Sequence, residues 1–161
     1  MSTRLILWNN DVEVIKGAAT AEGFAGQVEV ASLSFAANNR FASDREVAEK
    51  GKPMPGQGKA DADQTAITLS LPFGPWVADF QQRLFHGKTL GTVTLTEVEQ
   101  KVDGGKKTWK KIREIKLTEA WMESMSHSWN GNDSTVSIKV NYVGSTFGYD
   151  DAVASFSRSA K

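Results

Sequence analysis

The feature that most constrains the fold is a period-two alternation of apolar and polar residues through residues 117–129 and again through 134–143. Successive side chains of a β-strand point to opposite faces of a sheet, so this alternation predicts two strands. Asn130-Gly131 lies between them, and this dipeptide is the strongest short signal for a hairpin. We therefore predict an antiparallel hairpin with a turn at residues 130–131, or with a four-residue loop over 130–133.

An even number of loop residues sorts the side chains of both strands onto two faces of contrasting polarity. The predicted apolar face carries Trp121, Met125, Trp129, Val136, Ile138, Val140 and Tyr142, with Glu123 and His127 as polar exceptions. The predicted polar face carries Ser124, Ser126, Ser128, Asp133, Thr135, Ser137, Lys139 and Asn141, with Met122 as an apolar exception. A three-residue loop would mix the two sets, so the pattern favours an even loop. We expect the polar face to meet water.

Apolar residues also alternate along much of the remaining chain, which indicates an antiparallel β fold. The alternating stretches are residues 4–8, 12–16, 27–36, 65–71, 89–100 and 107–119. In two places the apolar positions change parity, between Val30 and Leu33 and around Gly144. A β-bulge or a sharp bend produces such a change, and strands need these bends at the corners of a barrel. The predicted fold class is therefore mainly β, an antiparallel β-barrel of two packed sheets, with the one helix described below.

Residues 89–119 form a second predicted hairpin. Matching Val93 and Leu95 with Ile115 requires a loop with an odd number of residues, such as 103–105. Glycine in the left-handed conformation suits such a loop.

One α-helix is predicted to interrupt the strands. Pro75 suits the first helical position, Gly87 suits the residue after the end, and an apolar stripe lies between them. The stripe consists of Trp76, Val77, Phe80 and Leu84. We expect this helix to cover one opening or side of the barrel, and we assign residues 1–149 to a single domain with an extended loop at 38–62. Residues 150–161 are interpreted as a polar tail.

The composition excludes several classes of site. The 161 residues include no cysteine and two histidines, so a disulfide framework, a thiolate nucleophile and a Cys-ligated metal are excluded, and no metal or cofactor is predicted. Lysine plus arginine and aspartate plus glutamate both total 19, which gives no general attraction to nucleic acid or membrane. No apolar run has the length of a membrane span or the pattern of a signal peptide.

No catalytic constellation is predicted. His127 lies between Ser126 and Ser128, but on a strand the histidine and serine side chains point to opposite faces. The basic stretch at residues 106–111 surrounds Trp109 and resembles a grip for single-stranded nucleic acid. Because the chain is otherwise neutral, we favour a solvated hairpin tip or a rim that faces an acidic loop of another protein. The sequence thus predicts a protein that is not an enzyme and has no nucleic-acid partner.

The order of these features resembles the Hcp family, the haemolysin-coregulated tube proteins of the bacterial type VI secretion system. The resembling segments are "VIKGAAT" at 14–20, "GQVEVASLSF" at 26–35, "FHGKTLGTVTL" at 85–95 and "KIREIKLTEAWMESMSHSWNGNDSTVSIKVNYVGSTFGY" at 111–149. Two departures are Ala18, where the family commonly has glutamate, and "FAANNR" at 35–40, where it usually has Trp-Gly.

The resemblance implies a small β-barrel that assembles into homohexameric rings, which stack into a tube inside a contractile sheath. Effector proteins travel in the lumen, a spike protein caps the tube, and no catalysis is involved. It also implies assembly in the cytoplasm followed by secretion without a cleavable signal peptide, and no stable membrane insertion.

Two sets of residues become candidates on this basis. The candidates for lining the lumen are Ser32, Ser34, Ser124, Ser126, Ser128, Thr135 and Ser137. The candidates for contacts between rings are charged residues of the long loop: Arg40, Asp44, Arg45, Glu46, Glu49 and Lys50. Two alternatives stay open: a tail tube of a phage or another contractile system, and a β-barrel module that binds a ligand.

Overall fold

The computed structural model describes residues 3–39, 62–149 and 152–157. It contains two compact units, residues Met1–Ser34 with Ala66–Lys161, and residues Phe35–Thr65, which are described separately below. The predicted assignment of residues 1–149 to a single domain stays a prediction.

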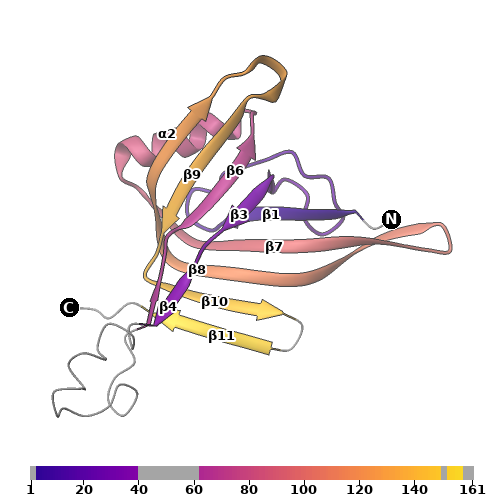
Figure 1. The fold of residues 1–161 in the computed structure, drawn as a ribbon. Helices are drawn as coiled ribbons and strands as arrows, with labels where there is room; N and C mark the ends of the chain where they lie inside the picture. The colour runs from indigo at the N-terminus through magenta and orange to yellow at the C-terminus, as the bar shows by residue number, and fades with distance from the viewer. Residues whose placement is uncertain (1–2, 40–61, 150–151, 158–161) are drawn as a thin grey trace, which may run out of the picture. The chain divides into compact units, whose positions relative to one another are not determined.

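The larger unit consists of antiparallel strands and one α-helix within the described residues (Figure 1). The strands are β1 (Arg4–Asn10), β2 (Val28–Val30), β3 (Ser32–Ser34), β6 (Ile67–Pro72), β7 (Thr89–Asp103), β8 (Lys106–Ser128), β9 (Thr135–Asn141), β10 (Gly144–Tyr149) and β11 (Ala152–Ser157). The helix is α2 (Trp76–His86), and a 3-10 turn spans Gly131–Asp133. The predicted class, mainly antiparallel β with one α-helix, is confirmed.

Strands β2 and β3 give the sheet its barrel-like curvature. The hydrogen-bonded order is β2-β1-β7-β8-β9-β6-β3, so two strands that follow one another in the chain lie at opposite ends of the path. Ala31 alone separates them, and its N–H donates to the carbonyl oxygen of Ser70 at 2.7 Å. The predicted parity change between Val30 and Leu33 is therefore confirmed as the bend at which the chain changes its pairing partner from β1 to β6.

Helix α2 packs its apolar stripe against the core. Phe80 is fully buried and meets the ring of Trp8 edge to face, with ring centroids 5.0 Å apart. Gly87 ends the helix in the left-handed conformation, and its N–H bonds to carbonyl groups of the last turn. Pro75 is the N-cap residue, so the helix begins one residue later than the position we predicted for proline.

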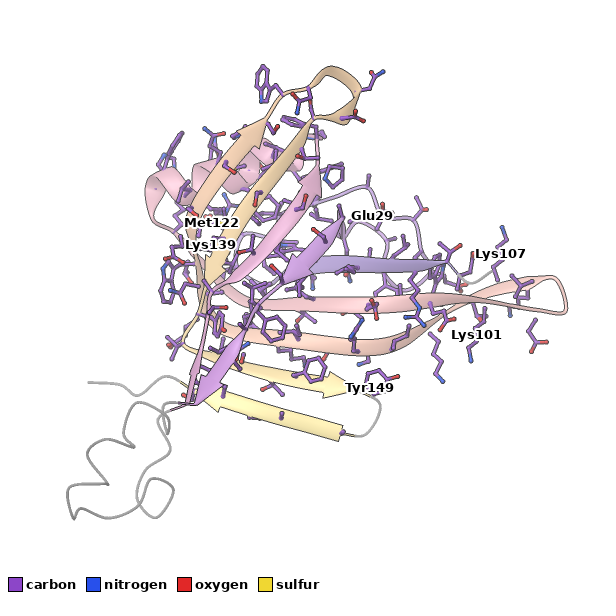
Figure 2. The ribbon with its side chains drawn as sticks, viewed as in Figure 1. Glu29, Lys101, Lys107, Met122, Lys139 and Tyr149 are labelled. Atoms are coloured by element: carbon purple, nitrogen blue, oxygen red, sulfur yellow. The ribbon has the colours of Figure 1, made fainter. Side chains whose placement is uncertain are left out.

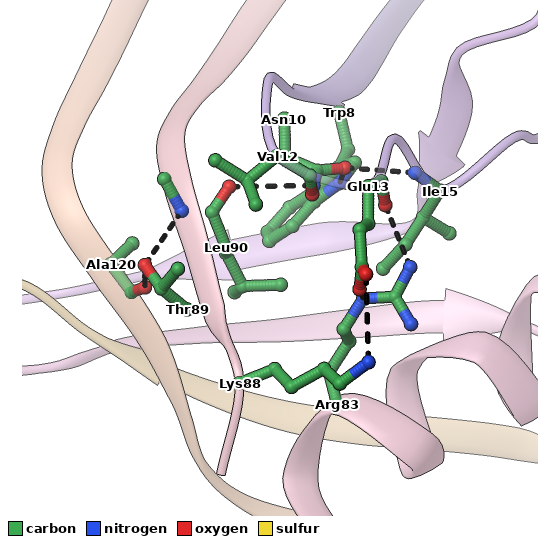
Figure 3. A network of polar contacts seen from close by, with 11 residues as sticks. Trp8, Asn10, Val12, Glu13, Ile15, Arg83, Lys88, Thr89, Leu90 and Ala120 are labelled. Atoms are coloured by element: carbon green, nitrogen blue, oxygen red, sulfur yellow. Dashed lines mark hydrogen bonds and ion pairs between the residues drawn. The ribbon is translucent and has the colours of Figure 1, made fainter. Parts of the chain in front are cut away.

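The segment after β1 differs from the predicted strand at residues 12–16. Asn10, which is buried, accepts hydrogen bonds from the Ile15 N–H at 3.0 Å and from the Trp8 indole at 3.3 Å. Its amide donates to the carbonyl oxygens of Val12 at 2.7 Å and Leu90 at 3.4 Å. These bonds turn the chain back on itself (Figure 3). Glu13 has a φ of 46°, outside the β region.

The same turn is held to the helix and to the start of β7. Arg83 donates to the Glu13 carbonyl oxygen at 2.7 Å, and the Glu13 carboxylate lies 3.5 Å from the Lys88 ammonium (Figure 3). The alternation at residues 12–16 therefore does not reflect the two faces of a strand. Ile15 is buried in the core, whereas Val12 and Val14 are exposed.

The β7–β8 hairpin shows why an odd loop is not needed. The loop is the two-residue turn Gly104-Gly105, both with positive φ, and Asp103 pairs with Lys106. The register changes between Glu97 and Val98, where Ile112 of β8 is an extra residue. This β-bulge restores the expected pairing of Leu95 with Ile115, so the pairing was right and the predicted odd loop was wrong.

The C-terminal segment contains a strand that the prediction of a polar tail did not include. β11 pairs with β10 over six residue pairs, from Gly144↔Ser157 to Tyr149↔Ala152. β10 also pairs with β8. The bend predicted near Gly144 therefore separates β9 from β10, two strands that pair with different parts of β8. The alternation in β11 is weak, because five of its six residues are exposed and hydrophobic periodicity needs a buried face.

The smaller unit is a short hairpin. β4 (Ala37–Asn39) and β5 (Ala62–Gln64) pair antiparallel, and the Ala36 N–H donates to the Thr65 hydroxyl at 2.9 Å. Both ends of the predicted loop 38–62 are thus parts of strands. The six charged loop candidates, Arg40, Asp44, Arg45, Glu46, Glu49 and Lys50, lie outside the described residues.

Candidate functional site

The strands β8, β9, β6 and β3 are neighbours in the sheet (Figure 1). The polar face predicted for one hairpin continues over all four. Residues that face one another across neighbouring strands point to the same side of the sheet. One row across the sheet is Ser126↔Ser137, Ser137↔Ser70 and Ser70↔Ser32. The next row is Ser124↔Lys139, Lys139↔Thr68 and Thr68↔Ser34. A third row, Ser128↔Thr135 and Thr135↔Pro72, lies closer to the hairpin tip.

All seven lumen candidates therefore lie on one continuous surface. Six of them are exposed and Ser137 is half-buried. Sequence reasoning missed two further members, Thr68 and Ser70, both half-buried. A signal for them existed, because residues 67–71 alternate apolar and polar in the same way as the hairpin.

The opposite side of the same four strands is apolar and buried. The row Met125↔Ile138, Ile138↔Leu69 and Leu69↔Leu33 lies directly between the two polar rows. Leu69 is fully buried and Ile138 is 1% exposed. The sheet thus has one face in the core and one face toward solvent.

A β-bulge in β8 corrects two of the predicted positions. Met122 pairs with Val140 and Ser124 pairs with Lys139, so Glu123 is an extra residue in β8. A bulge places two residues opposite one and reverses the parity beyond it. Met122 consequently belongs to the apolar face and is 6% exposed, whereas Trp121 lies opposite Asn141 on the polar face and is 37% exposed. Figure 2 labels Met122 and Lys139 where the parity changes.

The tip of the β8–β9 hairpin has the register of the predicted four-residue loop. Ser128 pairs with Thr135, and residues 129–134 connect them through the 3-10 turn. The Ser134 hydroxyl accepts from the Asn130 N–H at 3.1 Å and donates to the Gly131 carbonyl oxygen at 3.0 Å. The even parity that sorts the two faces is therefore confirmed.

The predicted apolar face ends at this tip in an exposed aromatic group. Trp129 is 77% exposed and meets Phe73 edge to face, with ring centroids 6.1 Å apart, so this member of the predicted apolar face lies outside the core of the protomer. His127 lies on the face of Val136, and its Nε2 lies 3.2 Å from the Gln81 side-chain oxygen. His127 therefore points away from Ser126 and Ser128, as strand geometry requires.

Serine and threonine hydroxyls make up most of the three rows, and Trp121 and Asn141 continue the same face beyond them. Lys139 is the single charged member of the three rows. Within residues 3–39, 62–149 and 152–157, no group of three or more histidine, aspartate or glutamate side chains has the arrangement of a metal site. In the same part of the chain, the structure contains no helix with the length and hydropathy needed to cross a membrane.

Comparisons with known proteins agree on one family. The family model described as "Type VI secretion system effector, Hcp" matches residues 7–149. No curated protein sequence matches the chain.

Several solved structures share the fold. One titled as the structure of a type six secretion system protein superimposes with a TM-score of 0.72 at 19% identity, over 91% of this chain and 84% of that chain. A mutant of Hcp1 from E. coli EAEC 042 gives a TM-score of 0.70 at 13% identity, over 96% of this chain and 97% of that chain. The secreted protein Hcp3 from Pseudomonas aeruginosa gives 0.65 at 11% identity, over 99% and 100%.

These identities are low, so the structural likeness establishes the fold, while the match of the family model over most of the chain establishes the relationship. The suggested resemblance is confirmed, and the chain belongs to the Hcp family of type VI secretion system effectors.

Proposed function

We propose that the chain is the protomer of a type VI secretion inner tube, in which hexameric rings stack and the polar face lines the lumen. The observation that carries the proposal is that four neighbouring strands of the sheet, β8, β9, β6 and β3, have a hydroxyl-rich surface on one side and a buried apolar surface on the other. A sheet in the wall of a water-filled tube has this division, because one face packs on the body of the protomer and the other meets water.

The edges of this sheet support assembly by addition of further copies. Within the described residues, β3 pairs with β6 alone, and residues 122–128 of β8 pair with β9 alone. Strand edges with free backbone groups are templates for pairing with another chain. Joining β3 of one copy to β8 of the next would continue the polar rows around a closed ring.

The composition of the polar face suits the passage of proteins along it rather than their retention. Serine and threonine hydroxyls are satisfied by water and offer little apolar area to a passing protein. A large apolar wall would instead retain cargo, since contiguous apolar patches mark binding surfaces. We therefore propose that effector proteins pass along this face without a specific binding site.

The remaining partners follow from the same proposal. The loop residues Arg40, Asp44, Arg45, Glu46, Glu49 and Lys50 would contact the next ring or the sheath, and a spike protein would cap the tube. The chain would leave the cell through the apparatus itself, and neither catalysis nor a cofactor is part of the function.

The proposal is tested by cysteine labelling, because the chain has no cysteine of its own. Ser126→Cys and Thr135→Cys place a thiol on the polar face, and Phe85→Cys places one on the exposed side of α2, where Phe85 is 71% exposed. Electron microscopy first establishes that each variant forms rings or tubes. A small maleimide should label all three variants in assembled tubes, whereas a reagent wider than the lumen should label position 85 alone.

Two results would reject the proposal. Equal labelling of positions 126 and 135 by both reagents along intact tubes would place the polar face on the outside. A chain that stays monomeric at every concentration would argue for the ligand-binding alternative.

A further inference from the structure

The β7–β8 hairpin extends past the start of β1 as a two-stranded arm with surplus positive charge. Residues 99–111 comprise the arm and its root beside β1. They include five lysines, one glutamate and one aspartate, a formal charge of +3 in a chain with formal net charge +0. The strands β7 and β8 pair along the whole arm, so the lysines sit on a defined backbone. Figure 2 labels Lys101 and Lys107 on the arm, with Tyr149 at the nearby end of β10.

A shallow pocket of about 140 Å³ lies at the root of the arm. Four strands contribute to it: β1, β7, β8 and β10. Its cations are Arg4, Lys101, Lys110 and Lys111, and its other lining residues are Glu99, Ile112 and Tyr149. The pocket therefore combines four cations with one carboxylate, one phenol and one aliphatic side chain.

The cations of the pocket are largely uncompensated. Glu99 lies between Arg4 and Lys110 in the register, yet within the described residues neither of these cations, nor Lys101, forms an ion pair. Lys111 pairs with Glu114 at 3.3 Å. After Glu99 and Glu114 are counted against the four cations, two positive charges remain.

In the neighbouring row of the same sheet, the cation Arg113 has a carboxylate partner, Glu97. The Arg113 guanidinium donates to both carboxylate oxygens of Glu97, at 2.7 and 3.2 Å. These hydrogen bonds raise the pKa of Arg113 above its ordinary value. Arg113 is thus committed within the chain, whereas Arg4, Lys101 and Lys110 are available to a ligand.

We propose that this pocket binds a short acidic segment of another polypeptide, with two carboxylates placed on either side of Glu99. One carboxylate would meet Arg4 and Lys101, and the other would meet Lys110 and Lys111. Lysine ammonium groups donate in several directions and suit such separated carboxylates. The inference does not depend on the tube, because it concerns a site within one protomer.

The lining favours an acidic peptide over a compact phosphate. A phosphate close to all four cations would also approach the Glu99 carboxylate, which repels it. The strands that form the pocket pair with one another through their backbones, so most of their N–H groups are already bonded, unlike the free N–H groups of a phosphate-binding nest. Ile112 and the Tyr149 ring add apolar surface for the aliphatic parts of a peptide, and the Tyr149 hydroxyl is a further donor.

The test is calorimetric titration of the full chain, at low salt, with a blocked peptide of alternating aspartate and glutamate. The matched peptide of asparagine and glutamine reports contacts that need no charge, and inorganic tripolyphosphate reports a phosphate site. We expect the acidic peptide alone to bind, with an affinity that falls as salt shortens the Debye length.

Paired variants separate the pocket from the general charge of the arm. Lys101→Gln with Lys110→Gln removes two pocket cations, and Lys106→Gln with Lys107→Gln removes two cations at the turn that do not line the pocket. We expect the pocket pair to weaken binding roughly tenfold and the turn pair by less than about twofold. Tyr149→Phe keeps the charge and should weaken binding by about two- to threefold.

Circular dichroism and size-exclusion chromatography confirm that each variant keeps the fold and oligomeric state of the parent. Equal weakening by the two lysine pairs would reduce the effect to general electrostatic attraction and overturn the site. Absence of binding by the acidic peptide, or selective binding of tripolyphosphate through Lys101 and Lys110, would overturn the proposed ligand.

Discussion

Neighbouring residues of strand β6 make unequal contributions to stability if the sheet has the two faces described above. Leu69 is fully buried and lies between Leu33 and Ile138 in the register, whereas Ser70 is half-buried on the polar face. Leu69→Ala removes a buried isobutyl group and leaves a cavity, which in packed cores costs about 2–5 kcal/mol. Because Leu69 is enclosed by other core side chains on the sheet, we expect about 3 kcal/mol.

Ser70→Ala is the matched change on the same strand. It removes a hydroxyl that water also reaches, and we expect the free energy of unfolding to change by less than about 1 kcal/mol. Leu69→Ala should lower the melting temperature by about 6–12 °C, since 1 kcal/mol corresponds to roughly 2–4 °C in a domain of this size.

Thermal and urea unfolding followed by circular dichroism give these values. All variants are compared at one protein concentration, because self-association adds to apparent stability. Ser137→Ala, in the same row as Ser70, serves as a second polar-face control. If Ser70→Ala and Ser137→Ala destabilise the chain as much as Leu69→Ala, the division into a buried and a solvated face is wrong.

Three other substitutions test local features of the fold by the same unfolding measurements. Gly91→Ala should cost at least about 2 kcal/mol, because Gly91 has a φ of 74° and an added Cβ would collide with the Asp11 carboxylate; an unchanged midpoint would contradict this backbone geometry. Asn10→Ala should cost about 2–4 kcal/mol, since it strands several buried polar groups at once, and a loss below 1 kcal/mol would argue against the turn shown in Figure 3. Arg113→Met should cost less than about 1 kcal/mol, because the pair with Glu97 is partly exposed and screened by water; a larger loss would show a role for Arg113 in assembly.

The amino-acid sequence by itself determined the elements whose side chains report local geometry. Period-two alternation located the β8–β9 hairpin and its two faces, because successive residues of a strand point alternately into the core and into water. Pro75 and Gly87 marked the two ends of the helix. Proline is favoured at a helix start, where its missing N–H breaks no helical hydrogen bond, and glycine readily adopts the left-handed conformation after the last turn. The resemblance of several segments to one family was also present in the sequence, and the family model confirms it.

The tertiary structure decided where the register shifts. The bulges at Ile112 and Glu123 each add one residue to a strand, and nothing in the local sequence distinguishes an extra residue from a paired one. The choice depends on which partner residues lie opposite: Ile115 must meet Leu95, and Met122 must meet Val140, for the apolar side chains to share one core.

Burial also depended on contacts between distant segments. Val12 and Val14 alternate like strand residues but lie in a turn, because the side chain of Asn10 binds backbone groups of Ile15 and Leu90 that no local pattern predicts. The polar surface likewise became continuous only when β3 and β6 were placed beside β9, which aligned Ser32 with Ser137, more than a hundred positions away. Alternation assigns a side chain to one of two faces, but long-range pairing decides which strands share that face and what the face meets.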